Sequence, residues 1–271
     1  MLHNFKVVPE EEFKISFDNR GFQYNDGFFE TLILHRGKIR FLDDHLDRIK
    51  KAMKVLGLAP LPHLNADYLQ TEVPALALQN YLDQETIRVK INFWRKPGGL
   101  FTPESEEAEI LITLQPQQPF PAKIRQADFY TGFPNRFTPF TFFKGPYALH
   151  YVQASLAKKK DGLDEFILLD EQGNISECLV SNIFWIKNNQ VFTPSLESGC
   201  IAGIMRLNIL RACQMLKAEA WEGFYAKADL LAADAVFTSN VTGLRPVLAI
   251  GQQQFKTDHP LIVQLGQLVL A

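Results

Sequence analysis

Cysteine is scarce in this sequence, and the few cysteines show no pairing pattern. Three occur among 271 residues, and none has the C-x-x-C spacing of a redox or zinc motif. An odd number of widely spaced cysteines argues against a disulfide framework and against a structural zinc site. We therefore expect no bound metal and interpret the cysteines as small buried hydrophobic residues. They are Cys178, Cys200 and Cys213.

Neither an excess of one charge nor a long apolar run is present. Lys and Arg number 28 against 30 Asp and Glu, which gives a formal net charge of −2 and a pI near 6.3. This balance gives no support for a nucleic-acid or membrane partner. No apolar run approaches the roughly 18 residues of a membrane span. The N-terminal residues, with the acidic run Glu10 to Glu12, do not resemble a signal peptide, so we expect a cytoplasmic protein.

Three common cofactor motifs are absent as well. The sequence contains no G-x-G-x-x-G, no G-K-[ST] and no H-E-x-x-H pattern, which removes the usual dinucleotide, P-loop and zincin interpretations. It also has no internal repeat and no low-complexity segment. Any cofactor must therefore be recognised in another way.

The N-terminal part of the chain predicts a helix followed by strands. Apolar residues recur at helical spacing from Asp43 to Gly57, where the glycine is typical of a helix end. Alternating apolar residues from Ile87 to Phe93 and the apolar run Ile110 to Leu114 predict two strands. Four prolines between Gln115 and Arg136 mark a connection between domains. We predict an N-terminal domain at 1–118, a linker at 119–133 and a C-terminal domain at 134–271.

The C-terminal part mixes both element types. Helical spacing predicts helices over 147–160 and 203–216. Strands are predicted at 166–169, 179–187, 190–192, 235–237 and 247–250, with a turn at 170–174. Asn188-Asn189 is a dipeptide that suits a tight hairpin. With 46% hydrophobic residues, the chain can bury a large core, and we predict a mixed α/β (α+β) fold.

Lys144 is the first candidate for chemistry. It lies in the sequence Phe142-Phe143-Lys144-Gly145-Pro146-Tyr147, an apolar and aromatic setting. Desolvation there would lower the pKa of Lys144, and a neutral amine can form a Schiff base with an aldehyde. The alternative is a lysine whose stem covers apolar surface while its charge stays in water.

Two further features belong to the same candidate site. Glu177 follows Lys144 by 33 residues, and its simplest interpretation is an exposed strand carboxylate. The segment Gly199 to Arg206 is a glycine-containing loop that leads into a helix, whose free N–H groups can bind an anion. An ordinary helix N-terminus remains the alternative for that segment.

Taken together, these residues resemble the class IV aminotransferases, the fold-type IV pyridoxal-phosphate enzymes. The resemblance covers nearly the whole chain, in the family's order and at roughly its spacing. It implies a smaller N-terminal α/β domain, a larger C-terminal domain with a mixed, barrel-like sheet, and a homodimer. The matching segments are Arg20 to Thr31, His45-Leu46-Asp47-Arg48, Lys144, Glu177 with Asn182, and Gly203-Ile204-Met205-Arg206.

The resemblance also implies a role for each residue. Lys144 holds pyridoxal 5'-phosphate as a Schiff base and acts as the catalytic base, and Glu177 faces the pyridine nitrogen and keeps it protonated. Arg48 binds the phosphate, although a surface helix pair with Asp44 is an alternative. The remaining residues implied to bind the cofactor are Asn182, Ile204, Met205, Val241 and Thr242.

The family contains several activities that act on small amino and carboxylate substrates. The string from Glu177 to Arg206 favours 4-amino-4-deoxychorismate lyase, which forms 4-aminobenzoate and pyruvate for folate synthesis. Leu149 lies five residues after the lysine, where branched-chain transaminases usually place a tyrosine, and it fits the lyase or the D-amino-acid branch better. Leu100 stands where such lyases usually place a carboxylate-binding arginine. A D-amino-acid or branched-chain transaminase is the alternative, and a catalytically silent cofactor-binding dimer is another. The candidate substrate contacts are Tyr24, Glu30, Arg95 and Arg245.

Overall fold

A computed structural model describes residues 1–119, 121–145 and 148–270, and their contacts form two units. The first unit comprises residues 1–119 and 143–145, and the second comprises 121–142 and 148–270. The chain leaves the first unit after Pro119 and returns to it around Lys144 before it re-enters the second. The candidate lysine therefore belongs to the same unit as the N-terminal sheet.

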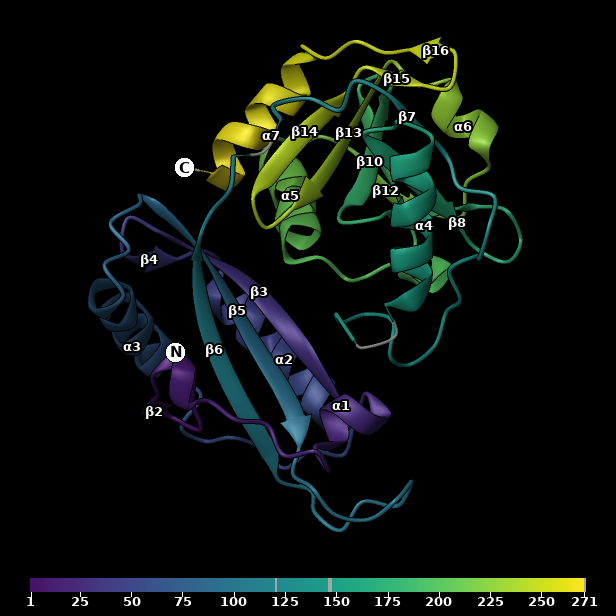
Figure 1. The fold of residues 1–271 in the computed structure, drawn as a ribbon. Helices are drawn as coiled ribbons and strands as arrows, with labels where there is room; N and C mark the ends of the chain where they lie inside the picture. Colours follow the sequence, from purple (N-terminus) through teal and green to yellow (C-terminus); the bar gives the residue numbers. More distant parts are fainter. Residues whose placement is uncertain (120, 146–147, 271) are drawn as a thin grey trace. The chain divides into compact units, whose positions relative to one another are not determined.

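The first unit contains a six-stranded antiparallel sheet (Figure 1). The residues predicted to alternate in its central strand do so: Ile87, Val89, Ile91 and Phe93 are buried, and the residues between them are partly exposed. One face of the sheet is therefore packed and the other is polar within this unit. In spatial order the strands are β2 (Lys6–Val7), β1 (Leu2–His3), β6 (Ala108–Pro116), β5 (Thr86–Arg95), β3 (Gly27–His35) and β4 (Lys38–Ile39).

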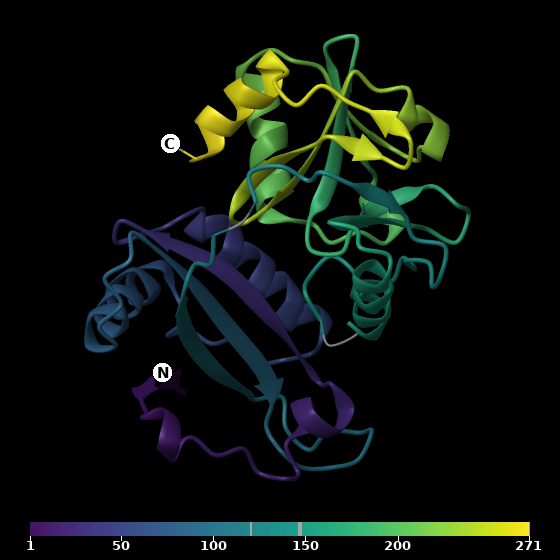
Figure 2. The same ribbon diagram turned by 45° about the horizontal axis from the view of Figure 1, so that its top comes forward.

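Helices cover the packed face of this sheet. Figures 1 and 2 show α2 (Leu42–Val55) along that face, where it contacts β3. The helix confirms the prediction for 43–57, and Gly57 follows it with a φ of 62°. A further helix, α3 (Ala66–Gln79), was not predicted, because Pro74 lies inside it. The short elements η1 (Glu10–Glu12) and α1 (Arg20–Tyr24) precede the sheet's central strands.

The second unit contains two five-stranded sheets. They share a buried cluster that includes Ile167, Trp185, Val236 and Val247. One sheet has the order β12 (Ala220–Gly223), β11 (Gln190–Pro194), β10 (Asn182–Lys187), β13 (Ala235–Asn240), β14 (Gly243–Val247). The other has the order β16 (Gln253–Gln254), β15 (Ala249–Ile250), β7 (Ala127–Phe129), β8 (Glu165–Leu169), β9 (Ile175–Cys178). The mixed α+β fold is therefore confirmed.

The helices of the second unit pack against these sheets. The helix α5 (Ile204–Met215) contacts β13 and α7 (Pro260–Leu270), and α4 (Leu149–Lys160) contacts β8. Both α4 and α5 were predicted, although Tyr147, the predicted first residue of α4, lies outside the described residues. The shorter helices are η2 (Leu196–Ser198) and α6 (Lys227–Leu231).

Three boundaries differ from the sequence prediction. The predicted linker contains β7, because a three-residue strand is too short to show a period. The predicted strand 179–187 begins only at Asn182, since Cys178 N donates to Ser181 O in a turn after β9. The predicted strand 247–250 is two strands, as the chain passes from one sheet to the other at Leu248.

Two further predictions, the tight hairpin and the burial of the cysteines, are confirmed. Asn188 and Asn189 adopt positive φ values of 49° and 63° and join β10 to β11. The three cysteines are buried free thiols. Burial raises the pKa of Cys200 to about 12 and that of Cys213 to about 11, so both thiols stay protonated and unreactive at neutral pH. Among the described residues, no helix is long and apolar enough to span a membrane.

Candidate active site

Lys144 extends the edge of the N-terminal sheet. Phe29 N on β3 donates to Lys144 O at 2.9 Å, which makes an isolated antiparallel bridge. The neighbouring Phe143 is buried, and its ring meets Phe28 edge to face at a centroid distance of 5.6 Å. The Lys144 backbone is thus anchored through its carbonyl and through the preceding residue, while its side chain remains partly exposed.

A buried charge network lies on the next residue of β3. Glu30 accepts a hydrogen bond from Arg48 Nε at 3.0 Å, a second from Arg48 Nη2, and lies 3.0 Å from His45 Nδ1. Burial alone would raise the pKa of Glu30, but the Arg48 charge and the His45 hydrogen bond outweigh it and hold that pKa below its usual value. Arg48 is only 5% exposed, so its guanidinium is not a surface group but part of this buried network.

Two of the candidate substrate contacts are engaged inside the first unit. The Glu30 carboxylate is 1% exposed and bonded as described, so it positions Arg48 in this structure. Arg95 donates to Asp26 Oδ2 at 2.9 Å and to the carbonyl oxygens of Leu56, Gly57 and Ser105. Four of its five N–H groups therefore have internal acceptors, which assigns Arg95 a structural role.

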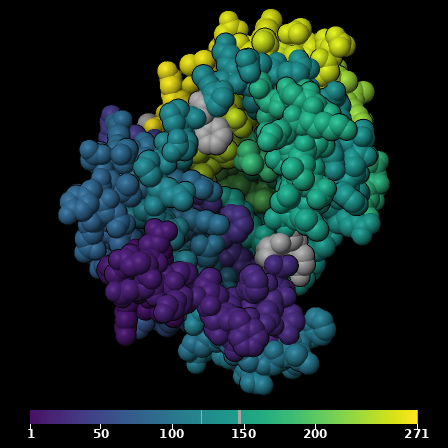
Figure 3. Space-filling view, in the orientation of Figure 1, coloured from purple at the N-terminus to yellow at the C-terminus, as the bar shows by residue number. Residues whose placement is uncertain are grey.

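Arg20 holds the loop that follows β5. Its Nη1 lies 2.7–3.0 Å from the carbonyl oxygens of Gly98, Gly99 and Leu100, and its Nε donates to Asp26. Figure 3 shows the purple N-terminal segment against this blue loop. Tyr24 lies here too, 4.9 Å below the Arg20 guanidinium and 5.8 Å from the Phe101 ring. Leu100, at the expected arginine position, is 75% exposed.

Glu177 lies on β9 of the second unit and is 3% exposed, so the interpretation as an exposed carboxylate is wrong. Its Oε1 accepts a hydrogen bond from the Tyr151 hydroxyl and a longer one, 3.5 Å, from Asn135 Nδ2. Its Oε2 accepts from Ile201 N at 3.2 Å. Sequence analysis missed Tyr151 and Asn135, because the contacts join segments far apart in the chain.

The N-terminus of α5 presents backbone donors. Its N-cap residue is Gly203, no side chain caps it and no acidic residue occupies its first turn, which contains Ile204 and Met205. Asn182 Nδ2 donates to Ile201 O at 2.8 Å and holds the preceding loop. A Cβ on Gly203 would lie 2.1 Å from Asn182 Oδ1, so a larger residue would require the Asn182 side chain to move. This arrangement suits an anion such as phosphate.

The hairpin between β13 and β14 contains Val241 and Thr242. Asn240 Oδ1 accepts hydrogen bonds from Thr242 N at 2.9 Å and Thr242 Oγ1 at 2.6 Å, which fixes this two-residue turn. On the adjoining strand, Thr238 and Ser239 have buried hydroxyl groups without a partner in the described part of the chain. Ser239 is the cross-strand neighbour of Asn182.

Arg245, the remaining candidate substrate contact, lies on β14. Its Nη2 is 3.7 Å from Glu165 Oε2, and both side chains are largely buried. Burial raises the pKa of Glu165, an effect that the nearby Lys158 and Arg245 charges partly oppose. A substrate carboxylate at Arg245 would therefore compete with Glu165.

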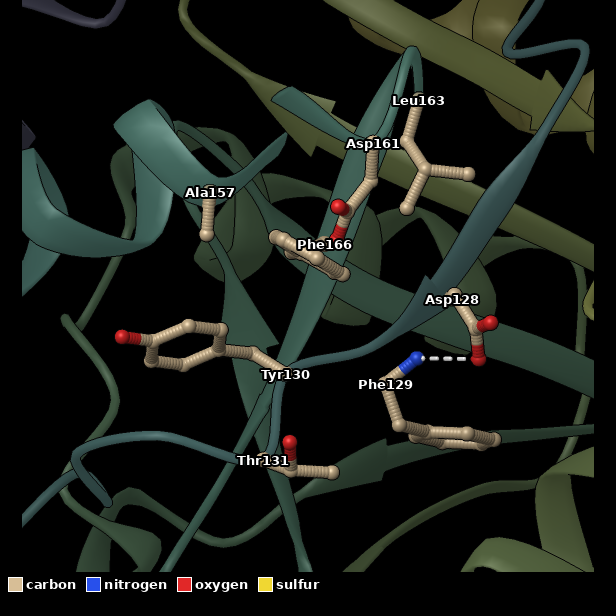
Figure 4. A pocket seen from close by; sticks show the side chains of 8 residues that line it. All are labelled: Asp128, Phe129, Tyr130, Thr131, Ala157, Asp161, Leu163 and Phe166. Carbon is tan, nitrogen blue, oxygen red and sulfur yellow. Dashed lines mark hydrogen bonds between the residues drawn. The ribbon is translucent and has the colours of Figure 1, made fainter. Parts of the chain in front are cut away.

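A hollow of about 380 Å³ in the second unit does not coincide with this site. Figure 4 shows Tyr130, Ala157 and Phe166 around it, with the Asp128 carboxylate bonded to the Phe129 amide. None of its lining residues is a candidate for cofactor or substrate binding. Likewise, within the described ranges, no group of three or more His, Cys, Asp or Glu side chains is arranged to hold a metal.

Comparison with known proteins identifies the class to which this fold and these residues belong. A family model described as amino-transferase class IV matches residues 27–250. The chain therefore belongs to the class IV aminotransferase family, whose members are enzymes that depend on pyridoxal phosphate.

Relatives with different activities are about equally similar. An aminodeoxychorismate lyase of Bacillus subtilis (strain 168) is 27% identical over 244 residues, 88% of this chain and 81% of its own. A putative branched-chain-amino-acid aminotransferase of Methanocaldococcus jannaschii is 27% identical over 253 residues, 91% of this chain and 86% of its own. A D-alanine aminotransferase of Bacillus licheniformis is 24% identical over 266 residues, with coverages of 96% and 91%.

Solved structures share the fold. The branched-chain aminotransferase of Escherichia coli superimposes with a TM-score of 0.87 at 22% identity, over 98% of this chain and 91% of its own. A putative 4-amino-4-deoxychorismate lyase of Legionella pneumophila gives a TM-score of 0.84 at 23% identity, with coverages of 97% and 95%. The fold-type IV architecture is therefore established.

The described residues fit pyridoxal phosphate. The second unit offers hydrogen-bond donors of the kind that bind a phosphate, at the uncapped α5 N-terminus and at the unpartnered Thr238 and Ser239 hydroxyls. The buried Glu177 carboxylate can accept the proton of a pyridinium nitrogen in a hydrogen bond. The partly exposed amine of Lys144 is a group of the kind that condenses with the cofactor aldehyde.

Proposed function

We propose that the protein is a 4-amino-4-deoxychorismate lyase that releases 4-aminobenzoate and pyruvate. The observation that carries the proposal is a pair of cations on the polar face of β5. Arg88 and Lys90 are two residues apart on that face. Lys90 Nζ lies 4.6 Å from the centroid of the Phe29 ring, and Phe29 N bonds to the Lys144 carbonyl.

Two neighbouring cations match a dicarboxylate. Each product of the lyase reaction keeps one carboxylate, so the substrate contains two, whereas a branched-chain amino acid has one carboxylate and an apolar side chain. Burial lowers the pKa of Lys90, and the nearby Arg88 charge lowers it further. Anionic groups bound here would relieve that repulsion. Lys90 and Arg88 thus take the role expected of an arginine at Leu100.

The residues would divide the chemistry as follows. Bound pyridoxal phosphate supplies an electron sink next to the substrate amine. The Lys144 amine, once displaced by the substrate, removes the proton from the ring carbon that bears the nitrogen and gives a proton to the departing pyruvate. Glu177 holds the proton on the pyridine nitrogen. Asn182 positions the loop before α5. The phosphate would be held by Arg48, the Ile204 and Met205 amides, Val241 and Thr242.

A transaminase is the second candidate, since the relatives include branched-chain and D-alanine aminotransferases at similar identity. In that reaction Lys144 would move a proton between the substrate α-carbon and the cofactor and leave the amino group for a 2-oxo acid. Our predictions of a homodimer and of a cytoplasmic location apply to either activity.

The decisive experiment supplies cofactor-loaded protein with 4-amino-4-deoxychorismate and no 2-oxo acid. Catalytic release of 4-aminobenzoate and pyruvate in equal amounts is expected. Lys90→Met should raise KM about ten-fold or more, as for the loss of one charged hydrogen bond, and Lys51→Met, at an exposed lysine of α2, should not. Absence of both products with intact cofactor would reject the lyase, and D- and branched-chain amino donors would then be tested.

A further inference from the structure

The Tyr151 side chain makes a contact that neither the resemblance nor the proposed reaction assigns. Tyr151 lies on α4, and its hydroxyl donates to Glu177 Oε1 on β9. Leu149, five residues after Lys144, is 71% exposed. The helix therefore directs Tyr151, two residues further on, toward the buried carboxylate.

We propose that Tyr151 is a positioning residue that orients Glu177 and thereby sets the protonation of the cofactor's pyridine nitrogen. The proposal rests on the cofactor role of Glu177 in the proposed function, and it holds for a lyase or a transaminase. In this proposal Tyr151 acts through Glu177 and does not contact the substrate.

The geometry supports this role because the carboxylate is held from several directions. Tyr151 and Asn135 donate to Oε1, and Ile201 N donates to Oε2. Asn135 is itself held at 2.9 Å from Ser176 Oγ, so it is the more distant donor to Glu177. Hydrogen bonds to a carboxylate stabilise its charged form and fix its plane. The Tyr151 hydroxyl is the closest of these donors.

Tyr151 is also suited to remain a donor at all working pH values. Burial raises the pKa of Tyr151 well above its usual range, and the Glu177 charge raises it further. The phenol therefore stays neutral and keeps its proton. The His150 ring contacts the Tyr151 ring, with a centroid distance of 4.0 Å.

The test compares cofactor-loaded wild type with Tyr151→Phe, Glu177→Gln and Tyr130→Phe. Tyr130 is a partly buried tyrosine of the same unit that packs on Phe166, so it controls for the loss of a phenol. The readouts are the pH titration of the absorption band of the lysine-bound cofactor and the rate of cofactor loss on dilution. Neither depends on turnover.

Tyr151→Phe should shift the midpoint of the absorption titration in the same direction as Glu177→Gln, by a smaller amount. It should also speed cofactor loss about ten-fold, as expected for the loss of one hydrogen bond to a charged group. Tyr130→Phe should match wild type. A Tyr151→Phe protein with the wild-type titration would overturn the proposal, even if its thermal stability fell.

A second variant covers the case in which Tyr151→Phe retains no cofactor. Tyr151→His keeps a ring and an N–H donor, and it should restore cofactor retention to within about three-fold of wild type. Failure of that rescue would also overturn the proposal. Because both readouts use bound cofactor alone, a protein that lacks lyase activity but shows the expected titration would reject the lyase function and support the role of Tyr151.

Discussion

At the scale of single residues, Glu30 is the centre of a buried charge network. The carboxylate lies between Arg48 and His45 and is sealed from solvent. Removing either partner of a buried ion pair is strongly destabilising, because the remaining buried charge is left without an opposite charge. Arg48 therefore keeps its position on Glu30 only while Glu30 stays ionised.

This network predicts a pH-dependent stability. Burial lowers the pKa of His45 from its ordinary value of 6.5, against the opposing influence of Glu30. The folded protein thus binds the His45 proton more weakly than the unfolded chain does. The free energy of unfolding therefore keeps its full value above the His45 pKa of the unfolded chain and decreases as the pH falls below it. The lowered pKa of Glu30 acts in the same direction, with stability lost below its ordinary value of 4.5.

We expect the free energy of unfolding in urea to fall between pH 7.5 and 5.5 by up to about 1.4 kcal/mol per pH unit from His45. His45→Gln should flatten this dependence, and His63→Gln, at an exposed histidine, should leave it unchanged. Equal slopes in wild type and His45→Gln would contradict the prediction.

Lys144 gives the most direct prediction about the cofactor. Lys144→Ala removes the amine that we propose bonds to the cofactor aldehyde, so the absorption band of the lysine-bound cofactor should disappear. Activity should fall at least about 10²-fold, as expected for the loss of a catalytic base. Lys160→Ala, at an exposed lysine at the end of α4, is the matched control. An unchanged band in Lys144→Ala would reject Lys144 as the cofactor lysine.

At the scale of elements, the β10–β11 hairpin shows a local sequence deciding local structure. Asn188 and Asn189 both have positive φ values, a conformation that asparagine tolerates and branched residues do not. Asn189→Val should lower the free energy of unfolding by about 1–2 kcal/mol in urea titrations. Asn189→Gly should be as stable as wild type. A valine variant equal to the glycine variant would show that the turn has relaxed.

Long periodic elements were predicted well, and short or irregular ones were not. The helix α2 and the strand β5 repeat their apolar residues over many positions, so local spacing suffices. In α3, Pro74 opposes helix formation locally, and the helix forms because tertiary packing outweighs that low propensity. The three residues of β7 become a strand only because β8 and β15 flank them.

At the scale of the whole molecule, the residues implied to bind the cofactor are divided between the two units. Lys144 and Arg48 belong to the first, and Glu177 and the α5 N-terminus belong to the second. A ligand that binds only the folded protein raises its stability with concentration. Stability should therefore depend on the cofactor.

Removal of the cofactor should lower the free energy of unfolding. At a free concentration about 100 times Kd the loss amounts to about 2.7 kcal/mol, seen as a lower melting temperature of the dialysed protein. Added pyridoxal phosphate should restore the melting temperature in wild type and restore less of it in Lys144→Ala. A melting temperature independent of cofactor would argue against binding to the folded state.

The sequence by itself determined the family, the candidate lysine and glutamate, and the periodic elements, because ordered motifs and apolar spacing are local information. Only the tertiary structure decided what each candidate touches. It assigned Arg95 to loop carbonyls, paired Arg245 with Glu165 and brought Tyr151 to Glu177. Such partners come from segments distant in the chain, and their contacts follow from how the strands and helices pack, which no local pattern records.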